Sequence, residues 1–443
     1  MIPQNLQSSY QQHLDDQVSS VKKVLSQSQF DHLLIAGGTL NYRFRDDTTY
    51  PFRLNPYLAR FAPLQHFPNS WLLISADQLK PKLWLYEPQD FWHKVETLDC
   101  ATISEAFDIE VTTTKPDLAK QLNAISGKIA ALGDASEFEA LDIEMTINPE
   151  SVLNVLDYHC GKKSEYEIAC LSHANRLGAA AHCAARDAFF DGASEYQAHQ
   201  AFLSAIDAED HQLPYDSIVA INQNSAILHY TFRERQKPQP SHSMLIDAGA
   251  SFLGYGSDIT RTYCRDSNHL FSDLIRALDD IQQKIIALIK PGVDYLDLHV
   301  KTHAEITQLL CDNQIIQCSV DEASQHGLSR TFFPHGLGHF LGIQVHDKGG
   351  WFRDESGAER QPPKEHPFLR LTRTLEQGHV VTIEPGLYFI PMLLKQLKSS
   401  SAEQLINWKL VEQLTPFGGI RIEDNVLVTD QGARNLTREF LAY

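Results

Sequence analysis

Basic residues are scarce in this chain of 443 residues, and their shortage excludes two classes of partner. There are 38 Lys and Arg residues against 56 Asp and Glu residues, which gives a formal net charge of −18. A chain this acidic lacks the electrostatic footprint of a general nucleic-acid binder. It also lacks the polybasic stretch that would hold it to anionic lipid. We therefore expect neither nucleic acid nor a membrane as a partner.

Long apolar runs, secretion signals and cysteine pairs are also missing. No apolar run approaches the ~18 residues of a membrane span. Residues 1–5, MIPQN, lack the basic and apolar regions that open a signal peptide. The seven cysteines are odd in number and none forms a CxxC pair, which argues against a disulfide framework or a thiolate zinc site. Together these absences predict a cytoplasmic protein.

What is present is the composition of a folded protein, 43% apolar and 21% charged. The chain is too long for one hydrophobic core, so we expect two domains. Residues 1–157 alternate helical and strand-like patterns, which predicts a small α/β domain with a mixed sheet. Its expected helix includes residues 14–25, and its expected strands are 32–35, 71–75, 82–86, 108–112 and 128–132.

Residues 158–443 form the expected second domain. Long proline-free stretches predict helices at 164–190, 195–208, 270–290 and 294–313, mixed with strand pairs. Sixteen of the 20 histidines lie at or after His159. Metal-binding and titratable chemistry is therefore expected in this domain.

Two aspartates lie in a predicted β-hairpin. Asp247 ends an apolar run, and Asp258 follows a turn that contains Gly254 and Gly256. If the two strands pair, the carboxylates converge on one face at about 5 Å between Cβ atoms. Buried like charges that close repel each other unless a cation or proton lies between them. The alternative is one surface acid and one turn acid.

Three histidines, His335, His339 and His346, fall within twelve residues that are rich in glycine. Glycine lets the backbone approach a metal or ligand closely, and neutral imidazole is the commonest metal ligand. The run therefore indicates a functional site, whereas a single histidine here would more often be structural.

Glu384 and Glu423 both lie in otherwise apolar, strand-like segments. An unpaired acid in a buried strand is costly, and a metal would remove that cost. For Glu423 the alternative is an ion pair with Arg421, two residues away on the same strand face.

Taken together, Asp247, Asp258, His339, Glu384 and Glu423 supply four carboxylates and one imidazole. Such a set nearly balances two divalent cations, and its oxygen-rich donors suit Mn²⁺ above Zn²⁺. Two metals held together can generate a hydroxide at neutral pH and stabilise a tetrahedral intermediate.

The segments LIDAGA, DITRT, PHGLGHFLGIQVHD, TIEPG and GGIRIEDN resemble, in order and spacing, the motifs of the pita-bread metallopeptidases. That superfamily includes methionine aminopeptidase, aminopeptidase P, prolidase and creatinase. The whole chain is similar to the bacterial Xaa-Pro dipeptidases (prolidases), a group close to organophosphorus acid anhydrolase. The resemblance implies an α/β (α+β) architecture, with a small N-terminal mixed-sheet domain and a C-terminal pita-bread catalytic domain.

The resemblance also implies a role for each matching residue. The implied metal ligands are Asp247, Asp258, His339, Glu384 and Glu423, of which Asp258 and Glu423 would bridge two ions. The implied catalytic residues are Glu384, His335 and His346, and the implied substrate-binding residues are His229, Arg421, Tyr215 and Asp47. His339 is preferred to His335 because the superfamily's ligand lies seven residues before a second active-site histidine. Asp47 would reach the site of the partner subunit in a homodimer.

The implied activity is hydrolysis of Xaa-Pro dipeptides, with release of C-terminal proline, by a hydroxide that bridges two divalent metals. Organophosphorus esters and fluorides are expected side substrates. The alternatives are aminopeptidase P-type cleavage of longer Xaa-Pro peptides and a non-catalytic pita-bread binding protein. Gly256-Ser257 and Lys348 depart from the usual prolidase pattern, and Lys348 leaves the fine substrate preference open.

Overall fold

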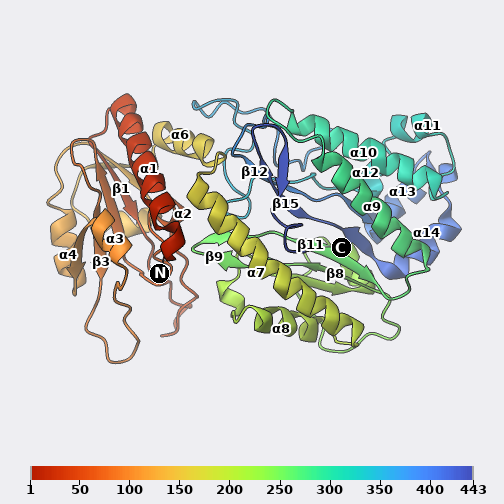
Figure 1. The fold of residues 1–443 in the computed structure, drawn as a ribbon, viewed down its shortest axis with the longest axis horizontal. Coiled ribbons are helices and arrows are strands. Elements are labelled where there is room, and N and C mark those ends of the chain that lie inside the picture. Colours follow the sequence, from red (N-terminus) through yellow and green to blue (C-terminus); the bar gives the residue numbers. More distant parts are fainter. Residues whose placement is uncertain (1, 442–443) are drawn as a thin grey trace. The chain divides into compact units, whose positions relative to one another are not determined.

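A computed structural model describes residues 2–441. The chain divides into two compact units. Unit 1 comprises residues 1–160, 164–169 and 354–358, and unit 2 comprises residues 161–163, 170–353 and 359–443 (Figure 1).

Unit 1 is built on one six-stranded mixed sheet with the order β4-β3-β2-β1-β5-β6. Its strands are β1 (His32–Ala36), β2 (Trp71–Ser75), β3 (Lys82–Tyr86), β4 (Asp108–Thr112), β5 (Ile129–Leu132) and β6 (Met145–Ile147). Its helices are α1 (Gln7–Ser28), α2 (Pro56–Ala59), α3 (Ala101–Ala106), α4 (Lys115–Leu122), α5 (Ala135–Phe138) and α6 (Glu150–Cys160), and a short 3-10 turn, η1, spans Gln4–Leu6.

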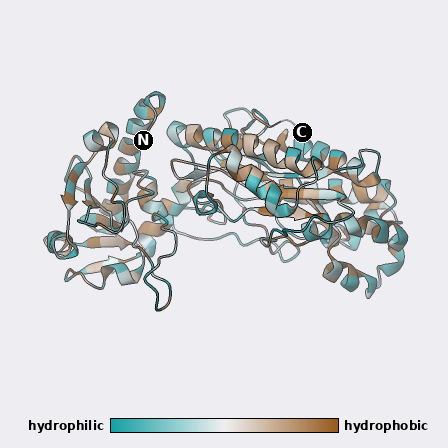
Figure 2. Cartoon of the chain, turned by 90° about the horizontal axis from the view of Figure 1, so that it is seen from below, coloured by the Kyte–Doolittle hydropathy of each residue, from teal (hydrophilic) through white to brown (hydrophobic). Residues whose placement is uncertain are grey.

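The central strands of this sheet are largely apolar because both faces are covered. Every residue of β2 is buried, and so are the last four of β1, as expected for strands that lie between two helical layers. Leu118 and Leu122 of α4 pack on Leu34 and Trp71, while α1 lies against β1 and β2. Figure 2 shows helices that carry both hydrophilic and hydrophobic residues beside strands that are largely hydrophobic. The expected small mixed-sheet α/β domain is confirmed.

Unit 2 contains two three-stranded antiparallel sheets, the short hairpin β9-β10 and a two-stranded antiparallel pair, β13-β14, whose strands are far apart in the sequence. The strands are β7 (Ile218–Ile221), β8 (Ser243–Asp247), β9 (Ser251–Phe252), β10 (Tyr255–Gly256), β11 (Thr260–Cys264), β12 (Val380–Ile383), β13 (Gly386–Tyr388), β14 (Gly419–Arg421), β15 (Asp424–Val428) and β16 (Ala433–Asn435). The helices are α7 (Glu165–Phe190), which starts in unit 1, α8 (Glu195–Ala205), α9 (Leu270–Ile286), α10 (Tyr295–Asp312), α11 (Val320–Gln325), α12 (Ser329–Phe332), α13 (Pro391–Lys398) and α14 (Trp408–Leu414). Four 3-10 turns, η2 (Asp210–Gln212), η3 (Asn222–Ala226), η4 (Glu403–Leu405) and η5 (Thr415–Phe417), complete it.

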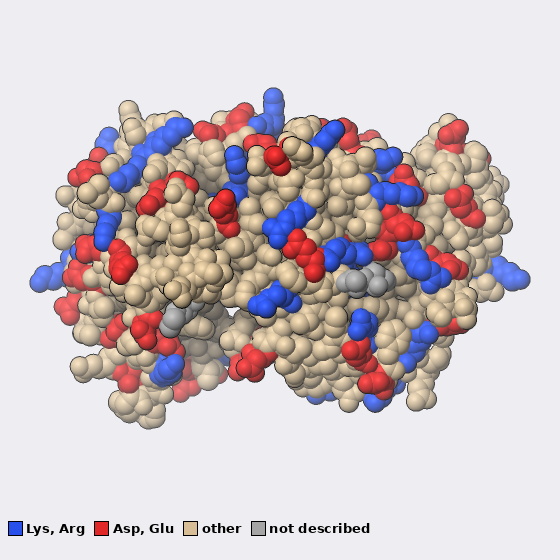
Figure 3. All heavy atoms as spheres, in the orientation of Figure 1, with Lys and Arg blue, Asp and Glu red and all other residues tan. Residues whose placement is uncertain are grey.

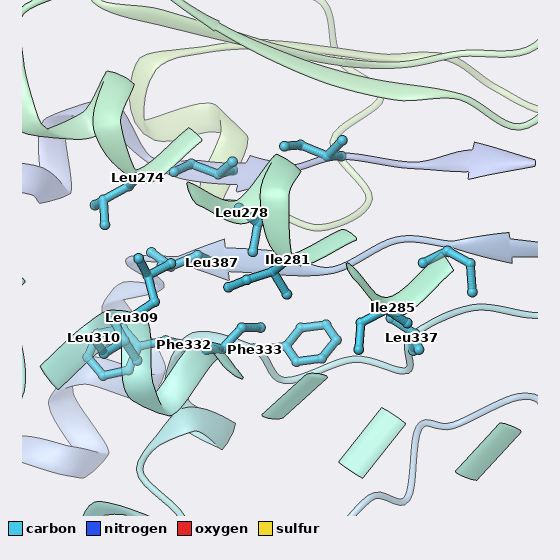
Figure 4. Packing of buried hydrophobic residues seen from close by; sticks show 14 of the residues in the cluster. Leu274, Leu278, Ile281, Ile285, Leu309, Leu310, Phe332, Phe333, Leu337 and Leu387 are labelled. Carbon is cyan, nitrogen blue, oxygen red and sulfur yellow. The ribbon is translucent and has the colours of Figure 1, made fainter. Parts of the chain in front are cut away.

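Each sheet of unit 2 is covered by a pair of helices. The first sheet has the order β11-β8-β7, and Phe189 of α7 and Phe202 of α8 pack on Val219 and Ile246. The second sheet has the order β12-β15-β16 and packs in one large apolar cluster with α9 and α10. Figure 4 shows part of that cluster, with Leu274, Leu278 and Ile281 of α9 facing Leu387, Phe332 and Phe333.

The sheet elements of unit 2 are interrupted at the acidic residues. The segment 380–388 forms two strands, β12 and β13, that are separated at Glu384 and Pro385. The segment 418–426 likewise divides into β14 and β15, which are separated at Ile422 and Glu423. Both acids were expected inside continuous strand-like segments. Because of these breaks, Glu384 and Glu423 lie outside the regular strands. Pro385 contributes to the first break, since proline has no N–H to donate to a neighbouring strand.

Within residues 2–441, no helix is both long enough and apolar enough to cross a membrane. On the face shown in Figure 3, basic and acidic side chains are interspersed.

Candidate metal centre

The four candidate carboxylates lie where strands begin, end or break. Asp247 is the last residue of β8, and Asp258 lies two residues before β11. The two strands pair as the sequence predicted, although Thr260, rather than Asp258, is the residue opposite Asp247. Thr260 also forms an isolated bridge with Glu423. One residue thus joins the first sheet to the segment between β14 and β15.

Three of the predicted ligands converge on one buried point. Ligand atoms of Asp258, His339 and Glu423 all lie within 4.8 Å of one another, and all three residues are buried. The Nε2 atom of His339 lies 3.4 Å from Asp258 Oδ2 and 3.8 Å from Glu384 Oε1. An imidazole among three carboxylates is a donor set suited to a hard divalent metal.

The ring of His339 is oriented by its neighbour's backbone. Its Nδ1–H donates to the Phe340 carbonyl oxygen at 2.8 Å, so Nε2 carries the lone pair that faces the acids. Asn425 fixes Asp258 in a similar way, because its Oδ1 accepts the Asp258 backbone N–H at 3.0 Å and its Nδ2 donates to the Asp258 carbonyl.

Asp247 is held in the same cluster by two hydrogen-bond donors. Tyr215 Oη lies 2.7 Å from Asp247 Oδ1 and 2.6 Å from Asp258 Oδ1. Arg421 Nη2 donates to Asp247 Oδ2 at 2.6 Å. Arg421, which the sequence offered as an ion-pair partner of Glu423, therefore pairs with Asp247 instead. Glu423 Oε2 accepts a hydrogen bond from Thr260 Oγ1 at 2.8 Å. Tyr215 and Arg421, both predicted to bind substrate, contact the candidate ligands directly.

Burial and the mutual repulsion of the carboxylates at the centre raise the pKa of two of them. Burial raises the pKa of Glu423 well above its usual range, and the charges of Asp258, Glu384 and Asp247 raise it further. Burial raises the pKa of Glu384 to about 7. Burial opposes a charge on His339, yet the hydrogen bond and charge of Asp258 raise the pKa of that imidazole. Divalent cations would remove this mutual repulsion, so the residues fit the metal that their chemistry predicts.

The other two histidines of the glycine-rich run border the centre. Nδ1 of His335 lies 3.7 Å from Glu384 Oε2, and its Nε2 lies 2.8 Å from Tyr388 Oη. The exposed ring of His346 lies 4.4 Å from the ring of His339, centroid to centroid. Exposed His229 is near enough that its charge lowers the pKa of both His335 and His346. Unit 2 therefore brings all the predicted histidines to one place.

Asp47 belongs to unit 1 and lies at the tip of a small hairpin. Tyr42 bridges Thr49, and the Tyr50 N–H donates to the Asn41 carbonyl at 2.8 Å. Asp47 itself is exposed. Its contribution to a partner subunit stays a prediction.

Several residues at the centre were not predicted from the sequence. Thr260 and Asn425 are buried polar residues of β11 and β15, and because other polar residues neighbour them in those strands, the sequence did not single them out. Tyr388 Oη accepts from Arg421 Nη1 at 2.9 Å. Asp424 is fully buried and pairs with Arg261 at 2.7 Å and with Arg438 at 2.7 Å. In the sequence, Asp424 directly follows Glu423 in GGIRIEDN, and no pattern indicated a separate structural role for it.

Comparison with known families agrees with this geometry. The profile of metallopeptidase family M24 matches residues 169–430. The profile of the Xaa-Pro dipeptidase N-terminal domain matches residues 8–158.

Curated relatives match over nearly the whole chain. A Xaa-Pro dipeptidase of Shewanella woodyi is 43% identical over 430 residues, which cover 97% of this chain and 98% of the relative. A Xaa-Pro dipeptidase of Pseudoalteromonas haloplanktis is 44% identical over 433 residues and 98% of each chain.

Among solved structures, aminopeptidase P from E. coli with the inhibitor Pro-Leu is similar with a TM-score of 0.74. The match is 24% identical and covers 98% of this chain and 96% of that one, so it supports the fold. It confirms the expected pita-bread architecture. The chain belongs to metallopeptidase family M24 and, within it, to the Xaa-Pro dipeptidases.

Proposed function

We propose that this chain hydrolyses dipeptides whose C-terminal residue is proline. The observation that carries the proposal is the convergence of Asp258, His339 and Glu423 on one buried point, bordered by histidines that reach the surface. Relatives named Xaa-Pro dipeptidase that match 97–98% of the chain support the substrate class. The matching N-terminal profile supports this branch over aminopeptidase P.

The proposed cofactors are two divalent ions, most simply Mn²⁺. Asp247, Asp258, His339, Glu384 and Glu423 would hold them, with Asp258 and Glu423 shared between the two ions. When bound, the ions would supply a hydroxide nucleophile at neutral pH and a Lewis acid for the scissile carbonyl. The oxygen-rich donor set is the reason for preferring Mn²⁺.

The protein groups would handle protons and orient the substrate. The nitrogen of a Xaa-Pro bond carries no hydrogen, so it must receive a proton to leave. Glu384 is the proposed donor, because its carboxylate lies between His335 and His339 at the centre, 3.7 Å from His335 Nδ1 and 3.8 Å from His339 Nε2. His335 and His346 border the same space, where a ring N–H can donate to the developing oxyanion.

Arg421 is the proposed partner of the substrate's free carboxylate. Its guanidinium has five N–H groups, and its three nitrogens contact Asp247, Tyr388 and Thr260. These contacts hold the group rigidly while N–H groups on its two terminal nitrogens stay available for a carboxylate. A dipeptide would therefore be preferred because its carboxylate follows directly after proline.

We further propose that the domains meet near residue 157, with residues 1–157 serving dimerisation and 158–443 catalysis. Asp47 would then complete the site of the partner subunit. Hydrolysis of organophosphorus esters and fluorides remains a proposed side activity, because a tetrahedral phosphorus centre resembles the intermediate of peptide hydrolysis. A cytoplasmic location is proposed on the seven cysteines, none of which forms a CxxC pair, a usage typical of a reducing compartment.

The test compares Gly-Pro with Gly-Pro-Gly as substrates of the Mn²⁺-loaded protein. We expect release of proline from Gly-Pro, loss of activity with chelator, and no metal-dependent turnover in Asp258→Ala. Asp280→Ala is the matched control, since Asp280 is an exposed aspartate on α9. Preferential cleavage of the tripeptide would instead assign aminopeptidase P activity. Wild-type turnover by Asp258→Ala would overturn the metal assignment.

A further inference from the structure

A second group of side chains that could hold a metal shares no residue with the carboxylate centre. His299, His303 and His366 bring ligand nitrogens within 4.8 Å of one another. His299 and His303 are four residues apart on α10 and so share one face of the helix. His366 comes from a turn in the 362–368 loop. The cluster thus joins a rigid helix to a loop at the edge of unit 2.

The three rings face one another at close range. Ring centroids are 4.7 Å apart for His299 and His303, 4.5 Å for His299 and His366, and 4.6 Å for His303 and His366. The first two pairs are nearly perpendicular, at 87° and 90°. Rings arranged edge to face can direct nitrogens of different residues toward one shared point.

His299 has polar atoms that the rest of the protein does not satisfy. Its side chain is 1% exposed, yet neither ring nitrogen has a hydrogen-bond partner among residues 2–441. Buried polar atoms are almost always paired with protein or solvent. Since imidazole always presents a lone pair on one nitrogen when neutral, His299 offers a buried acceptor that lacks a donor.

His303 is already oriented as a metal ligand would be. Its Nδ1 lies 3.0 Å from Ser329 Oγ, which leaves Nε2 as the nitrogen that can bind an ion. Metal-binding histidines commonly use their second nitrogen in this way, and the contact fixes the ring orientation. All three imidazoles are the neutral, ligand form at pH 7, because burial lowers the pKa of His299 to about 2 and that of His303 to about 3, and also lowers that of His366.

A cavity of about 200 Å³ gives access to the cluster. It is lined by the three histidines and by exposed residues of the loop, Glu365 and Phe368. His335 also lines it, so the cavity borders the carboxylate centre, but none of the five candidate ligands of that centre does. Arg330 also lines the cavity, and its charge lowers the pKa of His303 and His366. A nearby guanidinium favours an anion or hydroxide as the fourth ligand of an ion bound by three neutral imidazoles.

We propose that His299, His303 and His366 form an additional metal site that takes one nitrogen-preferring transition-metal ion, Zn²⁺ or Cu²⁺. Three imidazoles with one open position are a common arrangement for zinc, and imidazole also suits copper. The carboxylate centre has one histidine among its proposed ligands, so the two sites differ in donor chemistry. This proposal does not depend on the activity of the carboxylate centre.

The experiment counts metal in the whole protein after loading with Mn²⁺, incubation with Zn²⁺ and desalting. Wild type, His366→Gln and the control His326→Gln are compared by elemental analysis, since His326 is an exposed histidine that caps α11. We expect wild type and the control to retain one more Zn²⁺ per chain than His366→Gln. Zn²⁺ that displaces Mn²⁺ at the carboxylate centre should do so equally in wild type, His366→Gln and His326→Gln. The difference in Zn²⁺ content between these proteins therefore reports the histidine cluster alone.

Electron paramagnetic resonance of bound Cu²⁺ supplies a second readout with a distinct signature. Wild type should show a Cu²⁺ species with splitting from three nitrogens, and that species should be absent in His366→Gln and His303→Gln. Circular dichroism verifies that both variants are folded. Equal Zn²⁺ content in wild type and folded His366→Gln, or a Cu²⁺ signal from one nitrogen only, would overturn the proposal.

Discussion

Thr260 links two candidate ligands through a single side chain and its backbone. Its Oγ1 donates to Glu423 Oε2 at 2.8 Å, and its backbone pairs with both Asp247 and Glu423. The hydroxyl also accepts from Arg421 Nε at 3.3 Å. Thr260 is therefore a positioning residue, because it contacts the candidate ligands Asp247 and Glu423 and is not itself a candidate ligand.

The variant Thr260→Val keeps the shape of this residue and removes its hydroxyl. Glu423 then loses a buried donor, which costs about 1–3 kcal/mol. Loss of an outer-shell partner typically weakens metal binding about 10–100-fold. We expect a Mn²⁺ dissociation constant, measured by competition with a chelator, that rises by this factor.

Thr415→Val is the matched control for that measurement. Thr415 Oγ1 donates to the Val411 carbonyl at 2.8 Å at the end of α14. Its loss should lower stability slightly and leave Mn²⁺ affinity unchanged. Equal affinity in wild type and Thr260→Val would show that Thr260 does not position the ligands.

At the scale of secondary structure, periodic patterns predicted the long elements closely. The expected helix at 164–190 is α7, the helix at 294–313 is α10, and all five expected strands of unit 1 are present. These elements have large apolar faces that repeat at regular intervals.

The breaks around Glu384 and Glu423 could not be predicted in the same way. They depend on contacts with segments that are distant in the sequence, such as the bridge between Thr260 and Glu423 and the hydrogen bond from the Glu384 N–H to the Leu337 carbonyl. The candidate ligands could nevertheless be named from the sequence, because an acid in an apolar segment is conspicuous and the surrounding motifs resemble those of the superfamily. The partners Tyr388 and Asn425 are ordinary strand residues until the fold brings them to the centre.

The strands around the centre are fastened by a buried ion-pair network on β15. Asp424 Oδ1 accepts from Arg261 Nη2 of β11 at 2.7 Å, and its Oδ2 accepts from Arg438 Nε at 2.7 Å. Burial opposes the charge, but the two guanidinium groups hold the pKa of Asp424 below its usual value. The network joins β11, β15 and the C-terminal segment of unit 2.

Asp424→Asn should therefore destabilise the protein by about 3–5 kcal/mol, because it removes the buried carboxylate charge that Arg261 and Arg438 share. A lowered pKa in the folded state means that the Asp424 contribution is present above the unfolded pKa of about 3.9. It is lost as the pH falls through the lowered folded value. Urea unfolding should thus show that the free energy of unfolding decreases less between pH 7 and pH 3 in the variant than in wild type. The exposed Asp280→Asn should follow wild type, and a variant as stable as wild type at pH 7 would contradict the role of the network.

At the scale of the whole molecule, the hairpin that carries Asp47 has the character of an interface. Tyr42, Phe44 and Tyr50 are 64%, 92% and 55% exposed. The hairpin is ordered by its own backbone hydrogen bonds. Aromatic side chains clustered on a monomer's surface mark interaction sites, and an acidic tip suits a polar or metal-containing site in a second copy. The homodimer implied by the resemblance would bury this hairpin.

Phe44→Ser should weaken that dimer. Truncation of an aromatic anchor costs at least about 2 kcal/mol, or roughly 30-fold in the dissociation constant. Sedimentation velocity should then show wild type at twice the chain mass of 50.0 kDa and a concentration-dependent share of monomer in the variant. Phe91→Ser is the control, since Phe91 is 87% exposed outside the hairpin. A monomeric wild type would refute the dimer.

The same dimer predicts complementation between two impaired chains. Asp258→Ala lacks a working centre but carries an intact Asp47, whereas Asp47→Ala has the opposite defect. If Asp47 acts in the partner's site, a heterodimer of the two has one complete site, made of the centre of the Asp47→Ala chain and the hairpin of the Asp258→Ala chain. Co-expression with two affinity tags and isolation of the doubly tagged species should recover about half the wild-type Gly-Pro activity per dimer, above that of either parent. If Asp47 acts within its own chain, the heterodimer has no complete site and its activity stays at the level of the impaired parents.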